Sequence, residues 1–129
     1  MGDERVTFDR HIGMEMDLDA PDDCVAAKIE IQPHHCNPTG FVNGGVIISL
    51  ADNIATGMAN RAYTVKTGER AFMVGIDLHA SMLSNQKGGT VRGESRVVRA
   101  GRRVTVIRTV VTGDGGKTLA EITTTHVPS

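Results

Sequence analysis

Aromatic residues are scarce in this chain of 129 residues, which has no tryptophan, one tyrosine and three phenylalanines. Proteins that stack on single-stranded nucleic acids depend on such side chains. The formal net charge is −1, so the chain also lacks the excess of basic residues that binding to nucleic acids requires. Both features argue against a nucleic-acid partner.

Long hydrophobic runs are missing as well. No stretch approaches the roughly 20 apolar residues that a membrane-spanning helix needs, and the N-terminus lacks the apolar core of a signal peptide. We therefore expect no membrane association and a cytoplasmic location.

Cysteine is too rare for a disulfide framework, since only Cys24 and Cys36 occur, and reduced thiols are expected in the cytoplasm. His34, His35 and Cys36 are adjacent, but their spacing fits no common zinc pattern. Adjacent residues on an extended backbone also point to opposite sides. We therefore expect no metal site.

The most informative stretch covers residues 37–59. Its first part contains the turn formers Asn37-Pro38 and Gly40. Asn43 then stands where a helix N-cap is expected, and Gly44 and Gly45 leave the N–H groups of the first turn uncovered by side chains. Apolar residues follow at the spacing of a buried helix face, at positions 47, 50, 51, 54, 55 and 58. Such a helix start can stabilise a developing negative charge.

Asp52 lies in the middle of the same predicted helix. Most carboxylates in that setting are simply solvated, but its distance from Gly44 is informative. The separation of eight residues corresponds to roughly 12 Å of helix rise. A carbonyl group held at the Gly44 N–H is therefore out of reach of Asp52 in the same chain. If both residues act on one substrate, they come from two chains of a dimer with paired composite sites.

Alternation of apolar and polar residues predicts strands on both sides of the helix. Residues 14–19 and 24–31 form a predicted hairpin, and the helix is expected to end near Tyr63. A meander of four strands is predicted after residue 71, with Val74, Ile76, Leu78 and Ala80 on one face of the first and the others at 90–99, 103–112 and 117–127. This order predicts a single α+β domain over 1–129, an antiparallel sheet curled around one central helix.

The pattern Asn37-x-x-Gly40-x-x-Asn43-Gly44-Gly45-x-x-x-x-Leu50-Ala51-Asp52 resembles the hotdog-fold thioesterases, in the phenylacetic-acid-degradation (PaaI-like) branch. That family usually shows Asn-x-x-Gly-x-x-His-Gly-Gly followed by Leu-x-Asp at the same offsets. The likeness covers nearly all of the chain after residue 20. It implies a sheet wrapped around one long helix, and hydrolysis of an acyl-CoA thioester with an aryl-acyl or short to medium acyl group.

The resemblance also implies roles for individual residues. The Gly44 N–H would stabilise the oxyanion, Asp52 of the partner chain would act as general base or nucleophile, and Asn37 would help to hold the water or the substrate. Asn43 stands where the family usually has His, and it cannot titrate near neutral pH. Gly75 stands where some relatives have Ser or Thr. For Asn37 and Asn43 the simpler interpretation is a loop turn and a helix cap.

Related enzymes contact coenzyme A through segments that correspond here to two regions of the chain and to a cluster of arginines. The implied CoA-binding residues are Gly45, Leu83, Ser84, Asn85, Arg99, Gly101, Arg102 and Arg103. The simpler interpretation of the arginine cluster, which also includes Arg92, Arg96 and Arg108, is a solvated strand face with ion pairs. Coenzyme A would enter only as part of the substrate, with no separate cofactor, and the chain would form a homodimer or a dimer of dimers.

Two other functions remain open. A non-catalytic hotdog dimer that binds acyl-CoA as a sensor or carrier is favoured by the departures at Asn43 and Gly75. A hydratase or dehydratase would need a catalytic histidine opposite a helix carboxylate, for which His34 and His35 are the nearest candidates.

Overall fold

One long helix lies at the centre of the computed structural model, which describes residues 6–129. This helix, α2 (Gly44–Thr67), begins after Asn43, whose side chain accepts a hydrogen bond from the Gly45 N–H. Its buried residues lie on one face and include every predicted position: Ile47, Leu50, Ala51, Ile54, Ala55, Met58, Ala59 and Ala62. The predicted N-cap and buried face are therefore confirmed.

The helix continues past Tyr63, where the sequence analysis ended it, as far as Thr67. Gly68 has the left-handed conformation, with φ of 75°, and its N–H bonds to the carbonyl oxygen of Thr64. Glycine is the usual residue at this position after a helix. The polar residues after Tyr63 are thus an exposed last turn, which hydrophobic periodicity alone does not detect.

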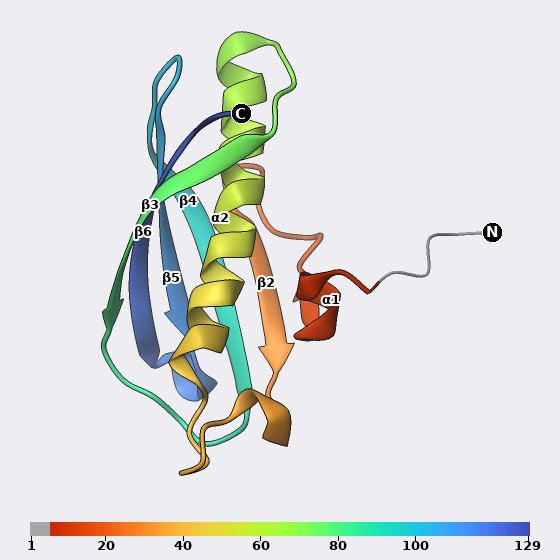
Figure 1. Cartoon of the computed structure of the whole chain (residues 1–129), viewed down its shortest axis with the longest axis vertical. Helices are drawn as coiled ribbons and strands as arrows, with labels where there is room; N and C mark the ends of the chain where they lie inside the picture. The colour runs from red at the N-terminus through yellow and green to blue at the C-terminus, as the bar shows by residue number, and fades with distance from the viewer. Residues whose placement is uncertain (1–5) are drawn as a thin grey trace, which may run out of the picture.

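A single antiparallel sheet covers the buried face of α2, as Figure 1 shows. Its strands are β1 (Met14–Met16), β2 (Val25–Glu30), β3 (Met73–Met82), β4 (Thr90–Ala100), β5 (Thr105–Thr112) and β6 (Thr118–Pro128), in the spatial order β1-β2-β4-β5-β6-β3. The remaining elements are the short helix α1 (Phe8–His11) and two 3-10 turns, η1 (Pro33–His35) and η2 (Asp114–Gly116). The predicted α+β architecture is confirmed.

The predicted strand order is wrong in one respect. β4, β5 and β6 do form a meander, but β3 pairs with β6 instead of β4. β2 occupies the other edge of β4, so β3 lies at the far edge of the sheet. The hairpin of β1 and β2 is confirmed, although β1 is shorter than predicted, because the Asp17 carboxylate accepts a hydrogen bond from the Asp19 N–H and turns the chain.

β3 also departs from the predicted alternation. A β-bulge lies between Gly75 and Asp77, so that Gly75 is opposite His126 while Asp77 is opposite Thr125. An extra residue in a strand changes which side chains share a face. Gly75 therefore lies on the α2 side of the sheet with Leu78 and Ala80, and Val74 lies on the other side. The predicted common face of Val74, Ile76, Leu78 and Ala80 is wrong.

Small residues let the helix approach the sheet closely. Ala51, Ala55 and Ala59 are completely buried on α2, and Gly93 in β4 lies against Leu50 and Ile54 of the same helix. A Cβ atom on Gly93 would lie 2.8 Å from the Ile54 Cδ1, which is too close for a real contact. This tight packing fixes α2 against the sheet and so fixes the position of Asp52. Among residues 6–129, no helix combines the length and apolar character needed to cross a membrane.

Candidate active site

The loop before α2 is held together by Asn37. Its side-chain oxygen accepts hydrogen bonds from the Thr39 N–H (3.0 Å), the Thr39 hydroxyl (2.6 Å) and the Phe41 N–H (3.2 Å). The loop-turn interpretation of Asn37 is therefore supported by three contacts. Its Nδ2 group is the part of the side chain that remains available as a donor.

The start of α2 presents one uncovered backbone donor. The Asn43 Oδ1 accepts a hydrogen bond of 2.8 Å from the Gly45 N–H, so the expectation that Gly45 leaves its N–H uncovered is wrong. The Gly44 N–H has no hydrogen-bond partner among residues 6–129. Gly44 is thus the position at which the helix start can receive an anionic oxygen.

The segment after β3 lies against this helix start. The Asn85 Nδ2 donates a hydrogen bond of 2.9 Å to the Val42 carbonyl, and the Val42 N–H donates one of 3.0 Å to the Gln86 carbonyl. The Met82 Cε lies 3.5 Å from the point that a Cβ on Gly44 would occupy. The chain therefore brings together the predicted residues Asn37, Asn43, Gly44, Gly45, Leu83, Ser84 and Asn85 at one end of the helix.

The other predicted CoA-binding residues lie elsewhere in the same chain. Arg99 lies at the end of β4, and Gly101, Arg102 and Arg103 form the turn between β4 and β5, which the Gly101 N–H closes by donating to the Val104 carbonyl. Thr90 and Ala100 mark the two ends of β4, which are roughly 33 Å apart at the usual rise of a strand. A single chain does not bring the two groups of residues together.

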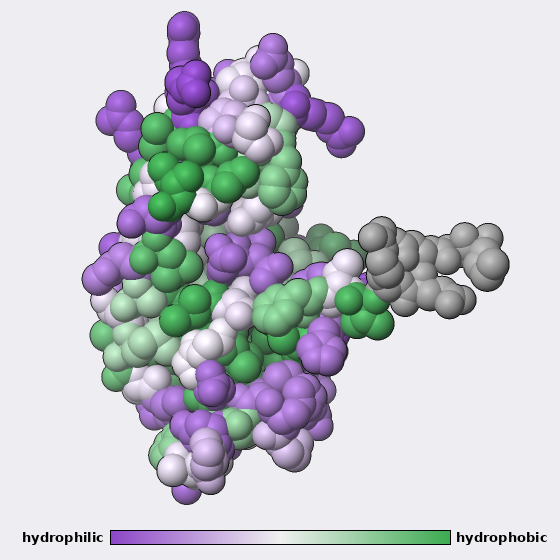
Figure 2. All heavy atoms as spheres, viewed as in Figure 1, coloured by the Kyte–Doolittle hydropathy of each residue, from purple (hydrophilic) through white to green (hydrophobic). Residues whose placement is uncertain are grey.

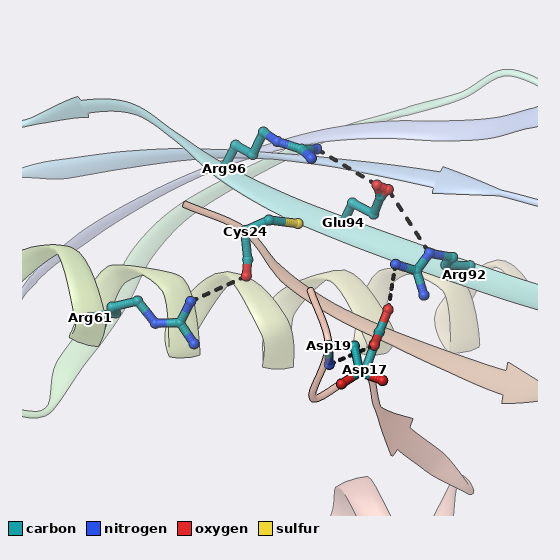
Figure 3. Close-up of polar contacts among 7 residues, drawn as sticks. All are labelled: Asp17, Asp19, Cys24, Arg61, Arg92, Glu94 and Arg96. Atoms are coloured by element: carbon teal, nitrogen blue, oxygen red, sulfur yellow. Dashed lines mark hydrogen bonds and ion pairs between the residues drawn. The ribbon is translucent and has the colours of Figure 1, made fainter. Parts of the chain in front are cut away.

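The arginine cluster divides into two parts. The Arg92 guanidinium bonds to Asp17 at 2.9 Å, and Glu94 lies 3.9 Å from Arg92 and 3.7 Å from Arg96. Figure 3 shows Glu94 between the two arginines. The backbone N–H of Asp19 and, second, the Arg92 guanidinium lower the pKa of the Asp17 carboxyl. Arg92 and Arg96 thus fit the ion-pair interpretation. Within residues 6–129, Arg99, Arg102, Arg103 and Arg108 form no ion pair.

Asp52 is exposed in the single chain and opens on a cleft of about 540 Å³. The cleft lies between the middle of α2 and the start of β3, and its lining includes Thr56, Asn60, Met73 and Gly75. The Asn60 side chain accepts a hydrogen bond of 2.7 Å from the Met73 N–H, which fixes the start of β3 to the helix. Asp52 is therefore accessible to a substrate from the side on which β3 begins.

A buried histidine that the sequence analysis missed lies on the other side of Gly75. His126, in β6, is completely buried, and its Nε2 lies 2.8 Å from the Thr124 hydroxyl. Its Nδ1 is buried without a hydrogen-bond partner among the described residues. Burial lowers the pKa of His126, and the nearby Asp52 carboxylate partly opposes this effect. The available signal was the alternation of Ala120, Ile122, Thr124 and His126 on the inward face of the last strand.

His35 has both ring nitrogens engaged, which bears on the hydratase alternative. The Nδ1 accepts a hydrogen bond from the Gln32 N–H at 2.9 Å, and the Nε2 lies 2.8 Å from the Ile12 carbonyl. A histidine held in this way supports the loop before α2 and has no free nitrogen for a substrate. In the part of the chain that is described, no group of three or more His, Cys, Asp or Glu side chains is placed to hold a metal ion.

The sequence profile of the thioesterase superfamily matches residues 39–120, which include the helix start, Asp52, Gly75 and the turn between β4 and β5. The chain belongs to this superfamily. Membership supports thioester hydrolysis as the general activity, and the arrangement of one long helix and an antiparallel sheet is the hotdog fold.

Individual relatives agree with this assignment. Rv1847 of Mycobacterium tuberculosis, named as an esterase, is 28% identical over 115 residues, which are 89% of this chain and 81% of the relative. Its solved structure superposes with a TM-score of 0.87, covering 96% of this chain and 97% of that one, at 22% identity in the structural alignment.

Two further solved structures share the fold. The thioesterase HI1161 of Haemophilus influenzae gives a TM-score of 0.83 at 22% identity, covering 92% of this chain and 80% of that one. A phenylacetic acid degradation-related protein of Ralstonia eutropha, described as a thioesterase, gives 0.78 at 22% identity, covering 92% and 87%.

Proposed function

We propose that this protein is an acyl-CoA thioesterase whose active sites form between two copies of the chain. Asp52 of one copy delivers the hydrolytic water as a general base or attacks the carbonyl directly, and the Gly44 N–H of the other copy stabilises the oxyanion. The observation that carries the proposal is that Asp52 opens on a cleft while the uncovered helix-start donor lies roughly 12 Å away along the same helix. One oxyanion donor typically contributes about 3–4 kcal/mol to lowering such a barrier.

The exposed edge of β3 supports a dimer. β3 pairs only with β6 in the described chain, and its exposed large hydrophobic residues include Ile76, which is 60% exposed. Figure 2 shows hydrophobic surface on the side of the molecule where β3 lies in Figure 1. A long apolar edge strand left open invites pairing with another strand.

Antiparallel pairing of two β3 strands about their midpoint would bring the proposed catalytic groups together. Met82 at the end of one β3 would then lie near Met73 at the start of the other. Met82 adjoins Gly44, and Met73 lines the cleft of Asp52. The two-fold symmetry that such an interface requires produces two identical composite sites.

The same arrangement suggests how coenzyme A binds. The β4–β5 turn lies at the end of the sheet where β3 begins, because Thr105 pairs with His126 and His126 pairs with Gly75. Arg99, Arg102 and Arg103 of one copy would therefore approach Leu83, Ser84 and Asn85 of the other. Guanidinium groups without a carboxylate partner suit the phosphates of CoA. The likeness to a phenylacetic acid degradation-related thioesterase favours a PaaI-like enzyme with an aryl-acyl or short to medium acyl substrate.

A non-catalytic acyl-CoA-binding dimer is the second candidate. Asn43 uses its side-chain oxygen to cap α2, and Gly75 offers no hydroxyl beside Asp52. Both features leave fewer side chains for chemistry than the family pattern provides.

A panel of acyl-CoA thioesters tests the two candidates, with the wild type and the Asp52→Ala variant measured side by side. We expect the variant to lose hydrolysis by about 100-fold or more, because a positioned base contributes 10²–10⁴-fold. Glu69→Ala, an exposed carboxylate outside the cleft, is the matched control and should keep full activity. Unchanged turnover in Asp52→Ala would refute the proposed mechanism, and tight CoA binding without hydrolysis across the panel would favour the second candidate.

A further inference from the structure

The gap beside Gly75 separates two polar groups, the Asp52 carboxylate and the His126 Nδ1, for which residues 6–129 provide no hydrogen-bond partner. A Cβ atom built on Gly75 would lie 3.8 Å from the Asp52 Oδ1, 3.7 Å from the His126 Nδ1 and 3.6 Å from the His126 Cε1. These are ordinary van der Waals distances, so the carboxylate and the imidazole border the same space, which is large enough for one methyl group. Any residue other than glycine would fill it.

The buried Nδ1 is unusual because buried polar atoms are nearly always hydrogen-bonded. His126 is completely buried, and its other ring nitrogen already bonds to the Thr124 hydroxyl. A hydroxyl can donate this bond, which leaves the ring proton on Nδ1. An N–H group in that position faces the gap and lacks an acceptor among the described residues.

Among the described residues, the Asp52 carboxylate is the charged group that raises the pKa of this imidazole. The strands on either side of His126 present uncharged residues, Gly75 from β3 and Thr105 from β5. The Thr105 hydroxyl is also buried with no hydrogen-bond partner in the described part of the chain, so it is the competing acceptor for Nδ1. A carboxylate accepts the stronger hydrogen bond of the two, because it is ionised.

We propose that His126 is a positioning residue for Asp52, with its Nδ1–H donating a hydrogen bond to the carboxylate across the gap at Gly75 once substrate is bound. Catalytic hydrogen bonds are often long in the free enzyme and tighten only in the complex. The bond would hold one carboxylate oxygen and direct the other toward the thioester. This inference rests on the proposed role of Asp52, whereas the contact between the two side chains can be measured without reference to activity.

Nuclear magnetic resonance tests the contact directly. The imidazole signals of His126 are assigned as those that disappear in the spectrum of His126→Gln. The pKa of His126 is then measured by pH titration of these signals in the wild type and in Asp52→Asn, with coenzyme A present. We expect Asp52→Asn to lower the pKa of His126, since it removes the carboxylate that favours the imidazolium. Thr105→Val should leave that titration unchanged. An unchanged titration in Asp52→Asn, or a change only in Thr105→Val, would overturn the proposal.

Kinetics then test the positioning role. Gly75→Ala places a methyl group between the two side chains without a clash, and we expect kcat to fall about 10- to 100-fold with little change in KM, which is a typical cost of slightly misplacing a catalytic group. If the effect acts through His126, Gly75→Ala causes no further fall in the His126→Gln background. If the losses in kcat from the two substitutions are additive, the proposed interaction between His126 and Asp52 is contradicted. If His126→Gln does not fold, the proposal is still tested by the rates of Gly75→Ala and by the titration of His126 in Asp52→Asn.

The two proposals fail in different ways. If Asp52 is not the catalytic carboxylate, Asp52→Asn keeps its activity although the His126 titration changes. If only the pairing is wrong, Asp52→Asn loses activity while the His126 titration stays the same.

Discussion

The loop that leads into α2 and the cleft beside Asp52 each contain a buried histidine, but the two regions treat it differently. In the loop, both ring nitrogens of His35 have backbone partners, at Gln32 and Ile12. Beside the cleft, the His126 side chain bonds only to Thr124 among residues 6–129, and its Nδ1 faces the gap at Gly75. The ring nitrogens of His35 are therefore both hydrogen-bonded within the loop region, whereas the cleft contains a buried polar atom that has no hydrogen bond among the described residues.

This difference separates structural from functional polar groups. A satisfied buried network makes one conformation rigid, whereas a buried donor left unpaired costs free energy that folding alone does not recover. The loop region has one exception, the Gly44 N–H, which is the group that the proposed function uses. We expect substitutions in the loop to change stability, and substitutions at Gly44 or in the cleft to change catalysis.

Among substitutions in the loop and at the helix start, Gly44→Pro should produce the largest effect on catalysis. Proline removes the backbone N–H, yet the first position of a helix tolerates it and Asn43 already has the extended conformation that precedes proline. We expect kcat to fall by about 100- to 1000-fold, the cost of losing one oxyanion donor. Gly44→Ala is the matched control, because it keeps the N–H and its methyl group would lie 3.5 Å from the Met82 Cε.

Mixed dimers test whether Gly44 and Asp52 of one active site come from different chains. Subunits of Gly44→Pro and Asp52→Ala are unfolded together, refolded and assayed. If the two groups meet across a two-fold interface, each heterodimer has one intact site, and a random mixture recovers about a quarter of the wild-type activity. No recovery, with exchange of subunits verified, would place both groups in the same chain and contradict the composite site.

His35→Ala should produce the next largest effect, on stability. The substitution leaves the Gln32 N–H and the Ile12 carbonyl without their partner, and we expect the free energy of unfolding to fall by about 2–3 kcal/mol. Denaturation with urea measures it. His34→Ala, the exposed neighbour, should change stability by less than about 0.5 kcal/mol. Equal effects of the two variants would mean that the loop does not depend on the His35 network.

The sequence predicted the helix start and the helix face well because both depend on local signals. A helix cap and a buried helix face are each recognised from residues only a few positions apart. Here these residues are Asn43, the two glycines after it, and Leu50 and Ala51. The position of β3 depends instead on competition between distant strands for the free edge of β4. β2 takes that edge, and no pattern inside β3 records this outcome.

The cleft was only half predicted for the same reason. Asp52 was singled out from its offset to Gly44 and from the family pattern, but His126 is 74 positions farther along the chain and resembles any inward residue of a strand. A bulge in β3 brings Gly75 opposite it. Gly75 was noted as a departure from the family pattern, and its position beside both side chains gives that departure a physical meaning.

The smallest expected effect is a dependence of stability on pH that reports on both histidines. Burial lowers the pKa of His35 and of His126, so below about pH 6.5, the usual pKa of histidine, the unfolded chain binds more protons than the folded one. The free energy of unfolding should therefore fall as the pH is lowered through this value toward the pKa of the folded state.

Urea denaturation at pH 7.5 and 5.5 checks this dependence and divides it between the two regions. His126→Gln should reduce the loss of stability between the two pH values and leave the share that comes from His35. If His126→Gln leaves the whole dependence unchanged, the imidazole beside the cleft takes up its proton equally well in the folded and unfolded chain. The cleft would then be open enough to solvate it, and the contrast with the closed network around His35 would be one of solvent access instead of hydrogen bonding.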